Sequence, residues 1–167
     1  MKTDLLKITV IAVVLAACIV LFQALLFPAL TLVLFVGITV TFTAGADRKK
    51  FPNYLLSISC GVAWGVLFHY MEHWATALGW NESVAMFAVF AVFTFAVRST
   101  HNVFLKNSWA NIVGFAFAGV IGVVYGGIEQ IFPVLTALLC GVVSAVLSVW
   151  VSELLIKTPA TAEAIEN

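Results

Sequence analysis

Residues 108–127 read SWANIVGFAFAGVIGVVYGG, a run of 20 residues without Asp, Glu, Lys or Arg. A helix of about 20 apolar residues is long enough to cross the hydrocarbon core of a bilayer. Small residues recur at every fourth position of the run, which places them on one face of a helix: Gly114, Ala118, Gly122 and Gly126. The run predicts a membrane-spanning helix with one face suited to close helix packing.

The composition of the whole chain agrees with a membrane protein. Hydrophobic residues make up 63% of the 167 residues and charged residues 10%, and the mean hydropathy is +1.12. About 25% of the residues of a soluble domain are charged. The net charge is zero, which argues against nucleic acid as a partner because nucleic-acid binding needs a basic surface. The expected partner is the lipid bilayer.

Breaks rich in Pro, Gly and charged residues divide the chain into six apolar segments. We therefore expect an all-α integral membrane protein with six transmembrane helices, at roughly residues 5–27, 28–46, 53–77, 83–103, 108–127 and 131–156. Residues 1–157 then form one transmembrane domain. Residues 158–167 are small, polar and acidic, and we expect them to form a disordered cytoplasmic tail.

Basic residues predict the orientation, because loops rich in Lys and Arg stay on the cytoplasmic side during insertion. With the N-terminus in the cytoplasm, the cytoplasmic ends of the segments collect all eight basic residues: Lys2, Lys7, Arg48, Lys49, Lys50, Arg98, Lys106 and Lys157. The opposite ends carry Glu72, Glu82 and Glu129. This division predicts a multi-pass protein of the bacterial inner membrane with both termini in the cytoplasm.

Glycine is distributed unevenly among the segments. The third segment places Ser57, Gly61 and Gly65 on one face, whereas the first and fourth segments contain no glycine. We therefore expect segments two, three, five and six to form an inner bundle, with one and four at its periphery. In the fourth segment we expect a row of aromatic side chains to face lipid: Phe87, Phe90, Phe93 and Phe95.

Short sequence matches suggest an inverted 3+3 repeat, without settling it. Residues 51–52 (Phe-Pro) and 60–62 (Cys-Gly-Val) of the third segment recur as residues 132–133 and 140–142 of the sixth, which runs the opposite way. Residues 27–31 of the second segment also match residues 132–136, and those two segments run the same way. The sequence leaves both pairings open.

Two stretches carry a family resemblance. Asn53 leads into Cys60-Gly61-Val62-Ala63-Trp64-Gly65, and Trp109 with Asn111 leads into Gly114. With these stretches and six short spans, the chain resembles the YcdZ/YahC-like family of small, uncharacterised bacterial inner-membrane proteins. The resemblance covers nearly the whole chain. It implies a polytopic membrane protein and assigns no catalytic or binding residue.

Residues 69–73, HYMEH, form the most conspicuous polar cluster, near the periplasmic end of the third segment. H-x-x-E-H is a metalloprotease signature in which two histidines ligate zinc and the glutamate acts as base. Those enzymes are large and soluble and use a further acidic ligand, so we expect neither an enzyme nor a cofactor here. Two alternatives remain open: a metal site at His69, Glu72 and His73, and a polar helix end at the membrane interface.

A third interpretation follows from the spacing of the histidines. His69 and His73 continue the face of Gly61 and Gly65 in four-residue steps, with Trp64 near the middle of the segment. A narrow face with ionisable groups at its mouth suits a small-solute pathway or a pH-responsive gate. The predicted pathway or gate residues are His69, Glu72, His73, Gly61, Gly65 and Trp64.

A smaller polar group lies at the cytoplasmic ends of the fourth and fifth segments. Arg98, Asn102 and Asn111 gather there, with His101 beside them. An arginine at this level is typical of an interfacial charge that reaches water. The alternative is a cytoplasmic vestibule formed by Arg98, Asn102 and Asn111 that contacts anions.

No Asp, Glu, Lys or Arg lies at the centre of any segment, so coupling through a buried carboxylate is not indicated. The sequence favours a small channel or facilitative transporter for a small neutral or weakly polar solute, assembled as a homo-oligomer. One alternative is a non-transporting membrane scaffold or accessory subunit. A second is a metal-binding membrane protein that uses His69, Glu72 and His73.

The orientation can be tested by labelling introduced cysteines. Cysteines placed after Gly79 and after Glu129 are expected to react with a membrane-impermeant reagent from the periplasm, because both positions lie at ends that lack basic residues. Labelling of both sites from the cytoplasm alone would contradict the predicted orientation.

Overall fold

Helices form nearly all of residues 2–156, the part of the chain that the structure, a computed structural model, describes. The six α-helices are α1 (Lys2–Leu25), α2 (Thr31–Thr43), α3 (Phe51–Ala77), α4 (Glu82–Ser99), α5 (Val113–Gly126) and α6 (Ile131–Leu155). Short 3-10 turns precede α2, α3 and α6, and a π-helical turn, Thr100–Phe104, follows α4. The predicted tail, residues 158–167, lies outside the described residues.

Among the described residues, four stretches are long and apolar enough to cross a membrane: Thr3–Leu25, Arg48–Ala77, Ser83–Phe104 and Ile128–Leu155. The other two apolar helices are shorter, since α2 has 13 residues and α5 has 14. Each is about 20 Å long at 1.5 Å per residue, against a hydrocarbon core of about 30 Å. The all-helical fold is therefore confirmed for the described residues, which contain full-length candidate spans for four of the six predicted membrane helices.

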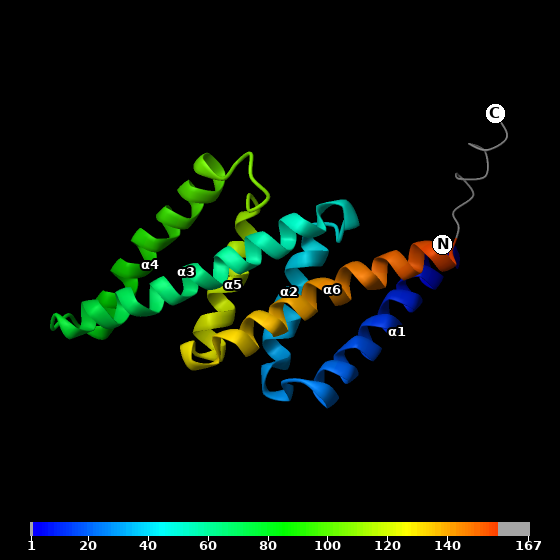
Figure 1. Cartoon of the computed structure of the whole chain (residues 1–167), viewed down its shortest axis with the longest axis horizontal. Helices are drawn as coiled ribbons and strands as arrows, with labels where there is room; N and C mark the ends of the chain where they lie inside the picture. The colour runs from blue at the N-terminus through cyan, green and yellow to red at the C-terminus, as the bar shows by residue number, and fades with distance from the viewer. Residues whose placement is uncertain (1, 157–167) are drawn as a thin grey trace.

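The six helices run alternately in opposite directions (Figure 1). The short helices α2 and α5 lie in the middle of the molecule, and the long helices α3 and α6 extend past them toward opposite ends. Helix α4 packs on α3, and α1 packs on α6. The predicted inner bundle of α2, α3, α5 and α6 is therefore present, with α1 and α4 at its periphery.

Helices α3 and α5 touch through their backbones at Gly61 and Gly119. A Cβ atom on Gly119 would lie 2.6 Å from the Cα atom of Gly61 and 2.5 Å from the amide nitrogen of Val62. A Cβ atom on Gly61 would collide with the backbone of Ala116. Only glycine at both positions permits so close a crossing, which maximises van der Waals contact between the helices.

Helices α2 and α6 form a second crossing of the same kind at Gly37 and Gly141. A Cβ atom on Gly37 would lie 2.5 Å from the carbonyl oxygen of Leu138 and 3.2 Å from the Cα atom of Gly141. A Cβ atom on Gly141 would lie 2.9 Å from the amide nitrogen of Ile38. The two crossings attach each short helix to one long helix.

The four small residues predicted to form one packing face of α5 have different neighbours and do not all contact the same helix. Gly122 faces α6, where an added Cβ atom would lie 2.8 Å from Cδ1 of Leu138. Gly114 is exposed. Among the glycines of α5, Gly119 makes the closest approach to the backbone of another helix, and it lies off the predicted stripe: Gly114, Ala118, Gly122 and Gly126.

The aromatic row of α4 divides between lipid-facing and packed positions. Phe87 is 77% exposed and Phe95 is 74% exposed, as expected for the outer face. Phe93 is only 2% exposed. Its ring packs edge-on against Trp64 and Phe68 of α3, with centroid distances of 5.4 and 5.2 Å. The expectation that Phe93 faces lipid is wrong, because α4 turns this side toward α3.

We expect Gly119→Ala to destabilise the protein more than Gly114→Ala, a change in the same helix. The methyl group at position 119 meets backbone atoms that cannot yield, and overpacking costs about 1–3 kcal/mol. At position 114 the nearest atom is Cγ2 of Val40, at 3.7 Å, and alanine favours the helix there. Melting temperatures of the purified variants in detergent measure the difference, and equal values would contradict this packing.

Candidate functional site

The polar cluster of α3 lies where this helix continues past α5. Helix α3 has 27 residues and α5 has 14, so the α3 face that carries Gly61 and Gly65 extends beyond its partner. His69 and His73 occupy this extension and are exposed. They form part of the wall of an open pocket of about 430 Å³, lined by His69, Glu72, His73, Thr76 and Trp80.

The side chains of this pocket can exchange protons and hydrogen-bond a solute. The Thr76 hydroxyl donates to the carbonyl oxygen of His73 at 2.8 Å, so the helix backbone already uses this donor. Within residues 2–156, no three His, Cys, Asp or Glu side chains come together as candidate metal ligands. Among the described residues, His69, Glu72 and His73 therefore do not come together as a three-ligand metal site.

The other three predicted pathway residues lie within the helix packing. Gly61 faces the backbone of α5, and a Cβ atom on Gly65 would lie 2.7 Å from Cβ of Val123. Trp64 is half-buried and packs edge-on against Phe93. The structure thus divides the predicted set: the two histidines and Glu72 line a pocket, and the two glycines and Trp64 lie between helices.

The predicted cytoplasmic vestibule is divided in the same way. Arg98 and Asn102 are exposed at the end of α4 and in the π-helical turn. Asn111 is half-buried. Its Nδ2 donates to the carbonyl oxygen of Lys106 at 3.2 Å, and its Oδ1 accepts from Nδ2 of Asn53 at 3.4 Å. These two hydrogen bonds of Asn111 connect the α4–α5 loop to the first turn of α3.

His101 is the functional candidate to which sequence reasoning gave no role of its own. Its side chain is 0% exposed, and its Nδ1 lies 2.6 Å from the carbonyl oxygen of Ala110. Because a carbonyl only accepts, Nδ1 carries the proton and donates it. Nε2 is buried and has no hydrogen-bond partner among the described residues. A π-helical turn has no recognisable local sequence pattern, so the sequence alone grouped His101 with the polar residues at the end of the fourth segment.

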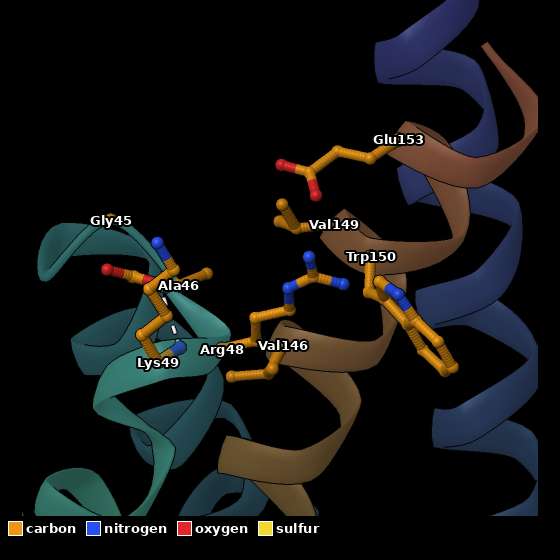
Figure 2. A pocket seen from close by; sticks show the side chains of 9 residues that line it. Gly45, Ala46, Arg48, Lys49, Val146, Val149, Trp150 and Glu153 are labelled. Atoms are coloured by element: carbon orange, nitrogen blue, oxygen red, sulfur yellow. Dashed lines mark hydrogen bonds between the residues drawn. The ribbon is translucent and has the colours of Figure 1, made fainter. Parts of the chain in front are cut away.

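A second polar pocket, of about 300 Å³, lies between α6 and the turn that joins α2 to α3 (Figure 2). Arg48 and Lys49 line it from the turn, and Trp150 and Glu153 line it from α6. Sequence reasoning missed this pocket because its two walls lie far apart in the chain. The only available signal was the run of basic residues 48–50.

The comparisons with known proteins identify a family without an assigned activity. A family model described as a protein of unknown function (DUF1097) matches residues 9–153. The match begins within α1, ends within α6 and therefore covers most of the described residues. No curated protein and no solved structure matches the chain.

The buried His101 is expected to stabilise the link between α4 and α5. His101→Phe keeps the ring volume but leaves the Ala110 carbonyl unpaired, at a cost of about 1–3 kcal/mol. His101→Asn offers an amide donor near the position of Nδ1 and should restore part of the loss. The melting temperature in detergent measures both effects.

Thr94→Val, in α4 just before the π-helical turn, is the matched control. The Thr94 hydroxyl is the other buried polar atom that has no partner within the described part of the chain, so its removal should leave the melting temperature unchanged or raise it. If His101→Phe behaves like Thr94→Val, the hydrogen bond to Ala110 does not stabilise the fold.

Proposed function

The chain belongs to the DUF1097 family, and we propose that it is a small channel or facilitative transporter of the bacterial inner membrane. Its solute is small and neutral or weakly polar. The protein consists of two inverted halves, α1–α3 and α4–α6. Within the family we place it beside the YcdZ/YahC-like proteins, on the resemblance around Gly61 and Gly114.

The main support for this proposal is that the same helix contacts are found when the two halves are interchanged. Interchanging the halves converts the α3–α5 contact into the α6–α2 contact and the α3–α4 contact into the α6–α1 contact, and all four occur. It also exchanges Gly61 with Gly141 and Gly119 with Gly37, the residues of closest approach. This pattern supports the match of the third with the sixth segment over the competing match of the second with the sixth.

Inverted repeats are a recurring architecture of membrane transporters. An odd number of spans in each half gives the second half the opposite orientation, and the solute site lies between the halves near the membrane centre, beside short or broken helices. Helices α2 and α5 are the short pair here and contact each other. Rocking of one half against the other would then expose a site between them to either side.

The direction of the helices supports six spans with both termini in the cytoplasm. In Figure 1 the start of α1, the α2–α3 and α4–α5 connections and the end of α6 lie toward one side, and the other three connections lie toward the opposite side. The first group contains the basic residues Arg48, Lys49, Lys50 and Lys106. The positive-inside rule assigns that side to the cytoplasm.

The chemistry of the inner helices suits an uncharged solute. Helices α2 and α5 contain no Asp, Glu, Lys or Arg, and neither do residues 131–152 of α6. A carrier driven by protons or sodium typically uses a buried carboxylate in such helices. We assign the pocket of His69, Glu72 and His73 as the periplasmic entrance, where charge on the imidazoles would modulate entry.

We further propose that the functional form is a homo-oligomer. Helices α2 and α5 are shorter than the hydrocarbon core, and a helix that is too short is accommodated by bilayer thinning or by association. Between them lies an apolar groove of about 560 Å³ that includes the exposed Gly114. A second copy of the protein packed on this face would cover both short helices, so that the bilayer need not become thinner around them.

Transport is tested with the purified full-length protein in liposomes. Stopped-flow light scattering follows swelling after mixing with urea, glycerol, acetamide or potassium formate. We expect at least one of the three neutral solutes to enter several-fold faster than into empty liposomes, with formate unaffected. A non-transporting scaffold or accessory subunit would leave every rate at the level of the empty liposomes, which would contradict the proposal.

Variants in the same assay test the entrance. Imidazole groups can gain or lose a proton, so we expect entry to depend on external pH. The His69→Gln/His73→Gln double variant should lose that dependence, because it removes both imidazoles from the pocket lining. Glu129→Gln, a charge on the same predicted side outside the pocket, is the matched control and should keep the wild-type profile.

A further inference from the structure

One wall of the pocket between α6 and the α2–α3 turn is anchored to the protein core. Its wall at residues 44–49 is held in place by hydrogen bonds. The Asp47 carboxylate accepts from the amide of Lys49 at 2.8 Å, and the Asp47 amide donates to the Tyr54 hydroxyl at 3.2 Å. The Tyr54 hydroxyl donates to the carbonyl oxygen of Ala44 at 3.2 Å. Because Tyr54 is fully buried and stacks on Phe115, the turn is anchored to the core.

Charges of both signs line this pocket. Figure 2 shows Arg48 reaching from the turn toward the side of α6 that carries Trp150 and Glu153. Lys49 adds a second cation to the lining. Arg48, Lys49 and Glu153 are exposed, and the structure gives Arg48 and Glu153 no ion pair with another described residue. A ligand with one negative and one positive group could therefore contact both signs at once.

The remaining lining places the pocket at the membrane surface. Trp150 is 41% exposed, and tryptophan beside Lys and Arg is typical of the headgroup level of a bilayer. Val146 and Val149 form the apolar part of the wall, on the side of the membrane-spanning stretch. A molecule in this pocket would have its polar end among the charges and its apolar end along α6. A membrane lipid has this form.

We infer that the pocket binds the headgroup of a zwitterionic phospholipid with a primary amine, phosphatidylethanolamine. Arg48 and Lys49 contact the phosphate, since a guanidinium group donates two parallel hydrogen bonds to phosphate oxygens. Glu153 accepts hydrogen bonds from the ammonium group. The same carboxylate disfavours an anionic headgroup by repulsion, and a choline headgroup has no N–H to donate to it. This inference does not depend on transport.

Native mass spectrometry of the delipidated full-length protein in detergent tests this inference. Dioleoyl-phosphatidylethanolamine, -phosphatidylglycerol and -phosphatidylcholine are added separately at equal concentration, and the bound fraction is measured. Tenfold in affinity corresponds to about 1.4 kcal/mol, which is close to the contribution of one hydrogen bond to a charged group. We expect phosphatidylethanolamine to bind about tenfold more tightly than the other two lipids.

Three variants separate the contributions of the charges. Arg48→Gln should weaken binding of phosphatidylethanolamine about tenfold. Glu153→Gln should reduce the preference over phosphatidylglycerol, because it removes the acceptor of the amine and one of the two carboxylates that line the pocket, the other being Asp47. Lys106→Gln, an exposed basic residue outside the pocket, is the matched control and should bind like the wild type.

Several results would overturn the inference. Equal binding of the three lipids to the wild type would show that no headgroup is selected. An unchanged preference in Glu153→Gln would show that the carboxylate does not contact the amine. Competition by soluble glycerophosphoethanolamine at the same concentration as the lipid would identify a free headgroup compound, rather than a membrane lipid, as the ligand.

Discussion

Backbone contact between helices at two glycine crossings is the interaction on which the rest of the structure depends. In lipid, an apolar side chain gains little by leaving acyl chains for another helix, so association relies on close van der Waals contact. Gly61 with Gly119, and Gly37 with Gly141, supply that contact. Each crossing attaches one short helix to one long helix, and the peripheral helices α4 and α1 then pack on the long helices.

The difference in helix length explains where polar groups are found. Because α5 and α2 are about half as long as α3 and α6, each long helix extends beyond its short partner. The extension of α3 carries His69 and His73, and the extension of α6 carries Glu153. Polar side chains are tolerated at these ends because they reach water, whereas the glycine crossings leave no room for a side chain.

The sequence predicted the helical class, the six apolar segments and the inner bundle, because hydrophobic length and glycine content are local properties. It did not predict Gly119 as the residue of closest approach. Helix α5 has glycines on more than one face, and only the placement of α3 and α6 decides which face meets which helix. His101 and the Arg48 pocket were missed for a related reason, since the first depends on a π-helical turn and the second on two distant segments. The pocket at His69 could be predicted because all its residues come from α3 and the turn after it.

The two polar pockets share a geometry but differ in chemistry, and the proposed topology accounts for the difference. Each lies beside the C-terminal part of a long helix and contains one glutamate, Glu72 or Glu153. On the cytoplasmic side, insertion retains Arg and Lys, so Glu153 shares its pocket with permanent cations. On the periplasmic side Glu72 has only imidazoles beside it, and these become cations only when protonated. A fixed charge pattern suits constant binding of a lipid, whereas a titratable one suits an entrance that responds to its surroundings. Under the proposed inverted repeat, the asymmetric distribution of basic residues across the membrane would thus give two related pockets different chemistry.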